Sequence, residues 1–163
     1  MTNEIERKFL IDGDFKAHAT DKIYISQGYL SMVPERTVRI RLHGDKGFIT
    51  IKGLGNGTGT TRFEWEKEIS ALEAKTLLKM CEPAIIEKIR YIIPSMDSLF
   101  FEVDEFLGDN HGLIIAEIEL PSEGTIIEEP SWLGKEVTGQ KQYYNSNLSK
   151  KPFKNWDQKS NKK

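Results

Sequence analysis

The sequence predicts a mainly β (α+β) fold, an eight-stranded antiparallel β-barrel with a charged interior, and three observations support this prediction. Apolar and polar residues alternate with period two through about eight segments, which is typical of strands. Turn signals such as HGDKG at 43–47 and PSMD at 94–97 join several segments, and short connections favour antiparallel neighbours. The polar strand positions are nearly all ionised, whereas a solvated sheet face normally mixes charged and neutral side chains.

The strands are expected at residues 3–10, 22–32, 36–43, 47–53, 61–70, 84–93, 98–106 and 113–120. A short helix is expected around 14–20 and another near 140–149. A longer helix should begin after Ser70, because Ser70 and Glu73 have the spacing of a capping box, and Pro83 should end it. The glycine-rich stretch at 53–61 lacks a phosphate-loop signature and is expected to be a flexible hairpin loop.

Length and composition indicate one domain over residues 1–153, followed by a polar, mobile tail at 154–163. The chain carries 23 Lys and Arg against 25 Asp and Glu, and a net charge of −2 argues against a general nucleic-acid-binding surface. Cys81 is the one cysteine, which excludes an internal disulfide. No stretch has the length and apolar character of a membrane span or leader, so we expect a cytoplasmic protein without a membrane or nucleic-acid partner.

Successive side chains of a strand point to opposite faces, so each of these strands has one apolar and one ionic face. The ionic faces carry the bases Lys8, Arg39, Arg41, Lys52, Arg62, Lys88 and Arg90 and the carboxylates Glu4, Glu6, Glu64, Glu66, Glu102, Asp104, Glu117 and Glu119. If the sheet closes with its apolar face outward under helices, these charges line an interior that can hold one small ligand. Burying so many ions is costly unless each is paired or ligated. Clustered bases suit a polyanion and clustered carboxylates suit Mg²⁺ or Mn²⁺, so the pattern predicts a site for a metal-bound polyphosphate.

These motifs resemble those of the CYTH, or triphosphate tunnel metalloenzyme, superfamily, and most of all its short bacterial inorganic triphosphatases. The matching motifs run in order over residues 3–149: E-x-E-x-K (Glu4, Glu6, Lys8), R-x-R (Arg39, Arg41), the Lys of IKG (Lys52), R-x-E-x-E (Arg62, Glu64, Glu66), K-x-R (Lys88, Arg90), E-x-D (Glu102, Asp104) and E-x-E (Glu117, Glu119). The resemblance implies an eight-stranded tunnel that binds a triphosphate and a divalent metal, with a C-terminal helix closing one end. That helix matches at Lys141, Tyr143, Asn145 and Leu148, but Gln140 and Gln142 stand where members often carry an acid and an arginine.

The resemblance also implies a function, the metal-dependent hydrolysis of a triphosphate, with inorganic tripolyphosphate giving pyrophosphate and phosphate. The Mg²⁺ or Mn²⁺ ligands are expected to be Glu4, Glu6, Asp104, Glu117 and Glu119, with Glu102 behind them. The phosphates are expected to bind Lys8, Arg39, Arg41, Lys52, Arg62, Lys88, Arg90 and Lys141. In the chemical step, Lys8 would neutralise charge near the bond that breaks. Glu64 and Glu66 would hold the attacking water or orient the bases beside them.

Three other functions stay open on the sequence. A class IV adenylate cyclase would need a nucleoside pocket, and no residue marks one. A thiamine triphosphatase would need an aromatic platform; Trp65 is available, but its phase against Glu64 and Glu66 predicts the outer face. A non-catalytic polyphosphate or nucleotide sensor would use the same bases without turnover. The number of metal ions, the general base and the choice between monomer and homodimer also stay open.

The acidic residues of the two E-x-E motifs carry one further expectation. If Glu4 and Glu6 crowd against Glu117 and Glu119, like-charge repulsion should raise some of their pKa values. The substitution Glu4→Gln is therefore expected to leave the metal-free protein at least as stable as the wild type.

Overall fold

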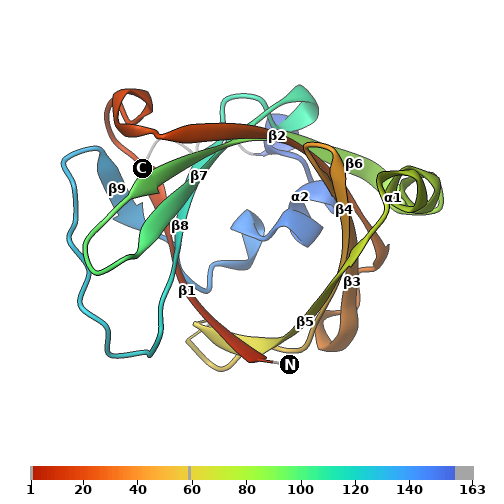
Figure 1. Ribbon diagram of the computed structural model, residues 1–163, viewed down its shortest axis with the longest axis horizontal. Coiled ribbons are helices and arrows are strands. Elements are labelled where there is room, and N and C mark those ends of the chain that lie inside the picture. Colours follow the sequence, from red (N-terminus) through yellow and green to blue (C-terminus); the bar gives the residue numbers. More distant parts are fainter. Residues whose placement is uncertain (1, 59, 157–163) are drawn as a thin grey trace.

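The computed structural model describes residues 2–58 and 60–156, and its strands form one antiparallel sheet that closes into a barrel (Figure 1). Around the barrel the order is β5, β4, β3, β2, β6, β7, β8 and β1, and a β1–β5 pairing completes the ring. The eight strands of the ring are β1 (Thr2–Ile11), β2 (Asp21–Ser31), β3 (Thr37–His43), β4 (Lys46–Lys52), β5 (Thr61–Ile69), β6 (Glu82–Pro94), β7 (Phe100–Phe106) and β8 (Ile114–Glu119). The predicted fold class is confirmed, and every strand ends within two residues of its expected bounds.

Strand β1 closes the barrel because different parts of it pair with different strands. Its first residues pair with β5, where Glu4 lies opposite Arg62, and its later residues pair with β8, where Lys8 lies opposite Glu117. Phe9 and Ile11 also pair with the short strand β9 (Leu133–Glu136). Strand β9 was not predicted, since four residues are too few to show a period-two alternation.

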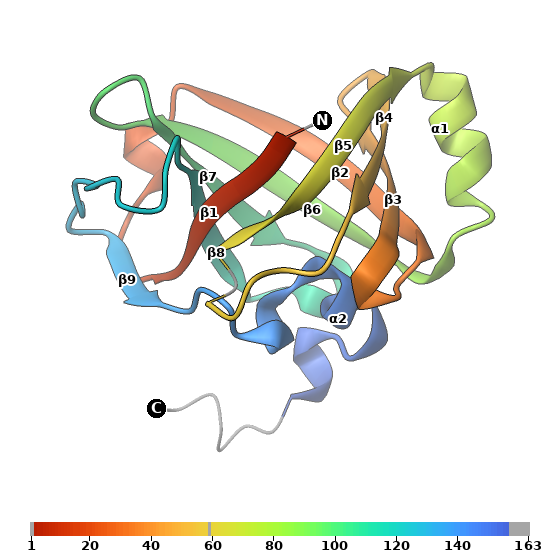
Figure 2. The ribbon, with the colours of Figure 1, turned by 90° about the horizontal axis from the view of Figure 1, so that it is seen from below.

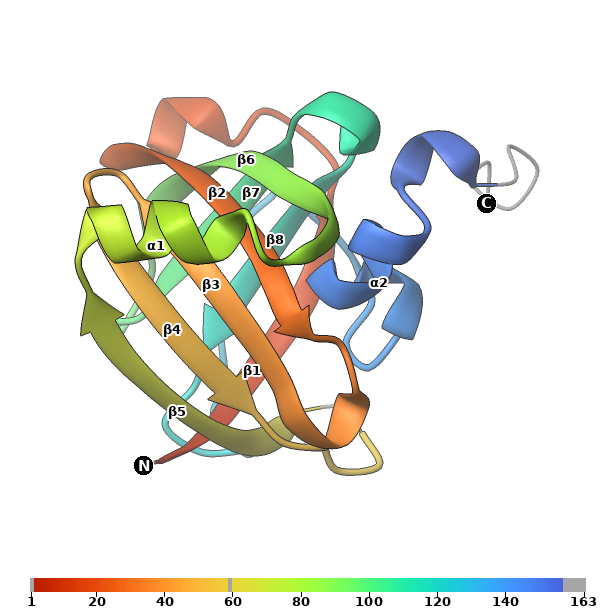
Figure 3. The ribbon, with the colours of Figure 1, turned by 90° about the vertical axis from the view of Figure 1, so that its right-hand side faces the viewer.

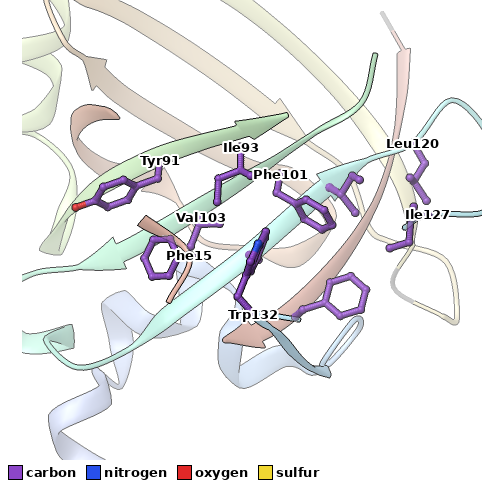
Figure 4. Close-up of a cluster of buried hydrophobic side chains, with 11 residues drawn as sticks. Phe15, Tyr91, Ile93, Phe101, Val103, Leu120, Ile127 and Trp132 are labelled. Atoms are coloured by element: carbon purple, nitrogen blue, oxygen red, sulfur yellow. The ribbon is translucent and has the colours of Figure 1, made fainter. Parts of the chain in front are cut away.

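The main apolar core lies on the outer face of the barrel (Figure 4). Its members are Phe9, Phe15, Tyr91, Ile93, Phe101, Val103, Ala116, Ile118, Leu120, Ile127 and Trp132. The ring of Trp132 meets that of Phe101 edge-on, with the centroids 5.1 Å apart. Phe15, Ile127 and Trp132 come from connecting segments, so these segments, rather than the expected helices, cover the outside of β1, β6, β7 and β8.

Helix α1 (Ala71–Leu78) covers the outside of β3 and β4 (Figure 3). The predicted capping box is confirmed, because the Ser70 hydroxyl accepts from the Glu73 amide while the Glu73 side chain accepts from the Ser70 amide. The helix packs closely on β4 at Gly47, where a Cβ atom would lie 2.7 Å from the Cβ of Ala74. It ends at Leu78, before the expected stop at Pro83, which lies inside β6.

Helix α2 (Asn145–Lys150) lies across one end of the barrel, after the 3₁₀ turn η4 (Lys141–Tyr143) (Figure 2). A second apolar cluster fills this end: Ile86, Phe106, Leu113, Ile115, Val137, Tyr143 and Leu148. Ile86, Phe106 and Ile115 have the same alternation phase as Lys88, Asp104 and Glu117, so the inner face changes from ionic to apolar towards α2. This apolar layer, which includes Leu148 of α2, closes one end of the barrel interior, as the family resemblance implied for the C-terminal helix.

The remaining short elements are 3₁₀ turns: η1 (Lys16–His18), in place of the helix expected around 14–20, η2 (Pro34–Arg36), η3 (Gly108–Asn110) and η5 (Phe153–Asn155). At the start of the expected tail Lys154 and Asn155 are exposed, while the Trp156 ring lies against Tyr143 and Phe153, with centroids 5.4 and 5.1 Å away. The rest of the expected tail, 157–163, lies outside the described residues. None of the helices in the described part of the chain is long and apolar enough to cross a membrane.

Candidate active site

A cavity of about 200 Å³ occupies the interior of the barrel, and charged side chains form most of its wall. All the predicted bases line it except Lys141, and all the predicted carboxylates line it except Asp104. In two places the barrel order sets a strand with a basic inner face beside one with an acidic inner face, β4 beside β5 and β6 beside β7. Lys52 lies opposite Glu64, and Arg90 lies opposite Asp104. Sorted charges in the sequence thus become cross-strand ion pairs in the fold.

The first group of pairs joins β1, β4 and β5. The Lys52 ammonium donates to both oxygens of Glu4, at 2.8 and 3.0 Å, and lies 3.7 Å from Glu64. Burial opposes the ionisation of Glu4, but the Lys52 charge prevails and lowers the pKa of Glu4 to about 2. Burial and the neighbouring Glu4 raise the pKa of Glu64 to about 7. Glu4 is therefore ionised at neutral pH, while Glu64 titrates close to neutrality.

The second group joins β6 and β7 around Asp104, which is 1% exposed. Arg90 holds Asp104 with two parallel hydrogen bonds of 2.8 and 2.9 Å, and the Lys88 ammonium lies 2.7 Å from it. Burial opposes ionisation of Asp104, yet these two bases lower its pKa to about 2. Glu102 accepts a further hydrogen bond of 3.2 Å from Arg90 and does line the cavity. Asp104 stands behind the bases with both oxygens engaged, so the geometry does not support the metal-ligand role expected for it.

A third group of carboxylates, on β1 and β8, is only partly neutralised. Burial and the charges of Glu117 and Glu4 raise the pKa of Glu6 well above its ordinary value. Burial and the nearby Glu4 and Glu102 also raise the pKa of Glu119. Burial acts in the same sense on Glu117, but its pKa falls well below the ordinary value because Lys8 lies 4.0 Å away and Glu6 shares a hydrogen bond with it. Like-charge crowding therefore raises the pKa at Glu6 and Glu119, whereas a neighbouring base outweighs it at Glu4 and Glu117.

Arg41 differs from every other base that lines the cavity. In the described part of the chain it alone among them has no carboxylate oxygen within 4.0 Å. Its Nε donates instead to the neutral Oε1 of Gln27, at 2.9 Å. Burial, together with the charges of Arg39 and Arg90, lowers the pKa of Arg41 to about 9, so it remains a cation at neutral pH. The Nε of Arg39 beside it is buried and has no hydrogen-bond partner within residues 2–58 and 60–156. Two arginines therefore present charge or donors that the protein itself does not satisfy, an arrangement suited to an anion.

A sequence model described as the CYTH domain matches residues 2–152. The chain belongs to the CYTH family. It is 47% identical over 158 residues to an inorganic triphosphatase of Acetivibrio thermocellus, covering 96% of this chain and 99% of the relative. It is 35% identical over 153 residues to an inorganic triphosphatase of Nitrosomonas europaea, covering 90% and 96% of the two chains. Its fold matches the crystal structure of an inorganic triphosphatase with a TM-score of 0.60 and 33% identity, over 91% of this chain and 95% of that one.

Several cavity residues of this CYTH chain could not be found from charge alternation, because they are neutral. Tyr29 and Thr50 line the cavity from β2 and β4. Tyr144 also lines it, and its ring centre lies 5.0 Å from the Lys8 ammonium and 5.7 Å from the Arg62 guanidinium carbon. Tyr29 and Thr50 could have been found from their phase along the strand. Tyr144 lies outside any strand and has no such signal.

Lys141, expected to bind phosphate, is exposed in η4 and does not line the cavity. The next residues along the chain take that place, since Tyr144, Asn145 and Ser146 all line it. The Asn145 Oδ1 accepts from Gln27 at 2.9 Å and from Lys88 at 3.0 Å, which fixes the start of α2 to the barrel wall. The C-terminal segment therefore contributes neutral groups, rather than a base, to the cavity.

The carboxylates of this CYTH cavity fit a hard divalent cation in chemistry, because all their donor atoms are oxygens. In the part of the chain that the structure describes, no three His, Cys, Asp or Glu side chains are already arranged to hold a metal ion. Glu6 and Glu119 have raised pKa values, so a bound cation would favour their ionisation. Glu4 would have to give up its contact with Lys52 to join them.

Proposed function

We propose that this CYTH chain hydrolyses inorganic tripolyphosphate to pyrophosphate and phosphate in a reaction that depends on Mg²⁺ or Mn²⁺. The observation that carries the proposal is Arg41, a buried cation inside a closed-ended cavity lined by six further bases, with no carboxylate partner among the residues that the structure describes. The two relatives named inorganic triphosphatase, at 47% and 35% identity over most of the chain, support the same substrate.

Substrate binding is an exchange of partners. The Arg39 Nε and the terminal nitrogens of Arg41 bind phosphate oxygens first, because within residues 2–58 and 60–156 these atoms have no protein partner to lose. Lys52 then leaves Glu4, and Lys8 turns from Glu117, so that both ammonium groups contact phosphate. The carboxylates freed in this way become available to the metal ion. Each protein ion pair is replaced by a contact with a more highly charged group, so the buried charges stay compensated throughout.

Glu4, Glu6, Glu117 and Glu119 would hold the metal ion. When bound, such an ion draws negative charge from the phosphates and makes a bound water more acidic. The protein's own part is positioning and electrostatic stabilisation, which carry most of phosphoryl transfer. Burial opposes the charge of Lys8, but Glu117 and Glu6 outweigh burial and raise the pKa of Lys8. Lys8 therefore stays charged beside the leaving group.

The sequence does not separate the roles of Glu64 and Glu66, but in this proposal the two residues take different roles. Glu64, with a pKa of about 7, is suited to hold the attacking water and accept its proton. Glu66 is more exposed and accepts a 2.7 Å hydrogen bond from Thr50, which in turn accepts from Arg39. Glu66 therefore orients Arg39.

The test is a substrate panel of tripolyphosphate, ATP and thiamine triphosphate, each with Mg²⁺ or Mn²⁺, analysed for products. We expect pyrophosphate and phosphate from tripolyphosphate at the highest kcat/KM, and complete loss of turnover with a chelator. Cyclic AMP from ATP at a higher kcat/KM would support the cyclase instead. Tight binding of tripolyphosphate without any turnover would support a sensor.

A further inference from the structure

Gln27 is a neutral side chain buried in the barrel wall beside the bases that line the cavity. It lies on β2 with 0% exposure and does not line the cavity. Both ends of its amide are used: the Oε1 accepts from the Arg41 Nε at 2.9 Å, and the Nε2 donates to the Asn145 Oδ1 at 2.9 Å. Gln27 thus stands behind the phosphate-binding surface and joins it to helix α2.

We infer that Gln27 is a positioning residue, which orients the Arg41 guanidinium towards the substrate phosphates without neutralising the charge of Arg41. Through Asn145, Gln27 also ties Arg41 to helix α2. This inference rests on the proposed function, because the phosphates of tripolyphosphate are the groups that Arg41 would bind. Gln27 itself does not touch the substrate.

The same barrel contains a matched comparison for the role of neutrality. Arg90 also donates through its Nε to a side-chain oxygen, at 2.8 Å, but that oxygen belongs to Asp104. The guanidinium of Arg90 is therefore both oriented and neutralised, whereas that of Arg41 is oriented at nearly the same distance by a group without charge. An amide acceptor fixes the geometry and leaves the full positive charge for an incoming anion.

The second end of the Gln27 amide connects two bases and the helix. Asn145 Oδ1 accepts from Gln27 and, at 3.0 Å, from the Lys88 ammonium. Lys88 is fully buried, so each of its donors needs a partner. The chain of contacts from Arg41 through Gln27 and Asn145 to Lys88 holds two phosphate-binding bases at a set separation and seats the start of α2 between them.

The substitution Gln27→Glu tests neutrality, because it keeps the shape and the acceptor for Arg41 but adds a negative charge, at the loss of the donor to Asn145. We expect KM for tripolyphosphate to rise at least about tenfold while kcat changes less than about threefold, as when binding common to ground and transition states is lost. The Tm should fall only slightly, since the counter-charge gained by the buried guanidinium offsets the lost hydrogen bond to Asn145.

The substitution Gln27→Leu tests orientation, because it removes the acceptor and the donor together. It should lower kcat/KM and also the Tm, since Arg41 and Asn145 each lose a buried partner. The Tm should therefore fall much more in Gln27→Leu than in Gln27→Glu, whereas kcat/KM falls in both. A merely structural role would make activity follow Tm. The exposed Gln142, which does not line the cavity, provides matched controls as Gln142→Glu and Gln142→Leu, both expected to behave as wild type.

A double-mutant cycle with Arg41→Met shows whether Gln27 acts through Arg41. In that background Gln27→Leu should change kcat/KM less than about threefold, whereas independent roles would multiply the two losses. Suppose that the wild type hydrolyses tripolyphosphate. A wild-type KM in Gln27→Glu, or losses of activity that follow Tm in both Gln27 variants, would then overturn this inference alone. A wild-type protein without tripolyphosphate hydrolysis would overturn the proposed function and this inference with it.

Discussion

Asp104→Asn removes one negative charge from the most buried ion cluster of the barrel. Asp104 faces Arg90 through two hydrogen bonds of 2.8 and 2.9 Å and Lys88 at 2.7 Å, with Lys88 fully buried and Arg90 6% exposed. The amide keeps the shape but leaves two buried cations with one carboxylate less between them. We expect the metal-free protein to lose stability strongly.

The loss of folding free energy in Asp104→Asn can be worked out in two ways. The pKa of Asp104 falls from 3.8 to about 2, and at about 1.4 kcal/mol per unit this is worth about 2 kcal/mol of folding free energy. Breaking a buried ion pair from one side costs about 3–5 kcal/mol. For a chain of this length each kcal/mol corresponds to about 2–4 °C, so the Tm should fall by about 4–20 °C.

Thermal melts with and without Mn²⁺ are the assay, and Glu102→Gln is the matched control on the same strand. The Glu102 side chain is 32% exposed and makes a single 3.2 Å contact with Arg90, so its loss should cost at most about 1 kcal/mol. The sign of the pH dependence is also defined. Because the folded pKa is depressed, the contribution of Asp104 is present above pH 3.8 and is lost as the pH falls through about 2. The difference between wild type and Asp104→Asn should therefore narrow over that interval.

The opposite pattern would refute this reasoning. If Asp104→Asn were as stable as the wild type without metal, and Mn²⁺ no longer raised its Tm, Asp104 would be a metal ligand rather than the counter-ion of two bases. A ligand of the native state raises the Tm in proportion to its binding, so the metal-induced shift reports the role directly.

Three further predictions follow from the same geometry. Glu4→Gln should lower the metal-free Tm, contrary to the expectation from like-charge crowding, because Glu4 is the counter-ion of Lys52 and its pKa is about 2; melts at neutral pH showing no loss would contradict this. Glu6→Gln should raise the metal-free Tm by an amount that grows with pH above 4.5, because burial and Glu117 raise the pKa of Glu6. The same substitution should abolish metal-dependent hydrolysis. A Tm difference that does not change with pH would contradict this reasoning. Arg41→Met should lower kcat/KM for tripolyphosphate by at least about a hundredfold without lowering the Tm. Lys141→Ala should keep wild-type steady-state kinetics, because Lys141 is exposed. Wild-type kinetics in Arg41→Met with a loss of activity in Lys141→Ala would instead place Lys141 in the site.

Charge alternation predicted most of the barrel and most of the cavity, because side-chain phase in a strand depends only on sequence position. Glu4, Glu6 and Lys8 share a face in any strand, and closure of the barrel turns that face inward. The capping box at Ser70 was equally local and was confirmed. Strand β9 could not be predicted, since it forms only because β1 offers it an edge.

The distribution of partners within the cavity could be decided only by the tertiary structure. Asp104 and Glu102 belong to one motif, yet the first is enclosed between Arg90 and Lys88 while the second reaches the cavity. Arg39 and Arg41 are likewise adjacent in phase, but only Arg41 meets a neutral amide. The sequence determined which residues face inward, because that follows from the two-residue period of a strand. Which of them neutralise one another, and which remain free for an anion, depends on barrel register and on distances of a few ångströms between strands far apart in the chain, where Coulomb energies change most steeply.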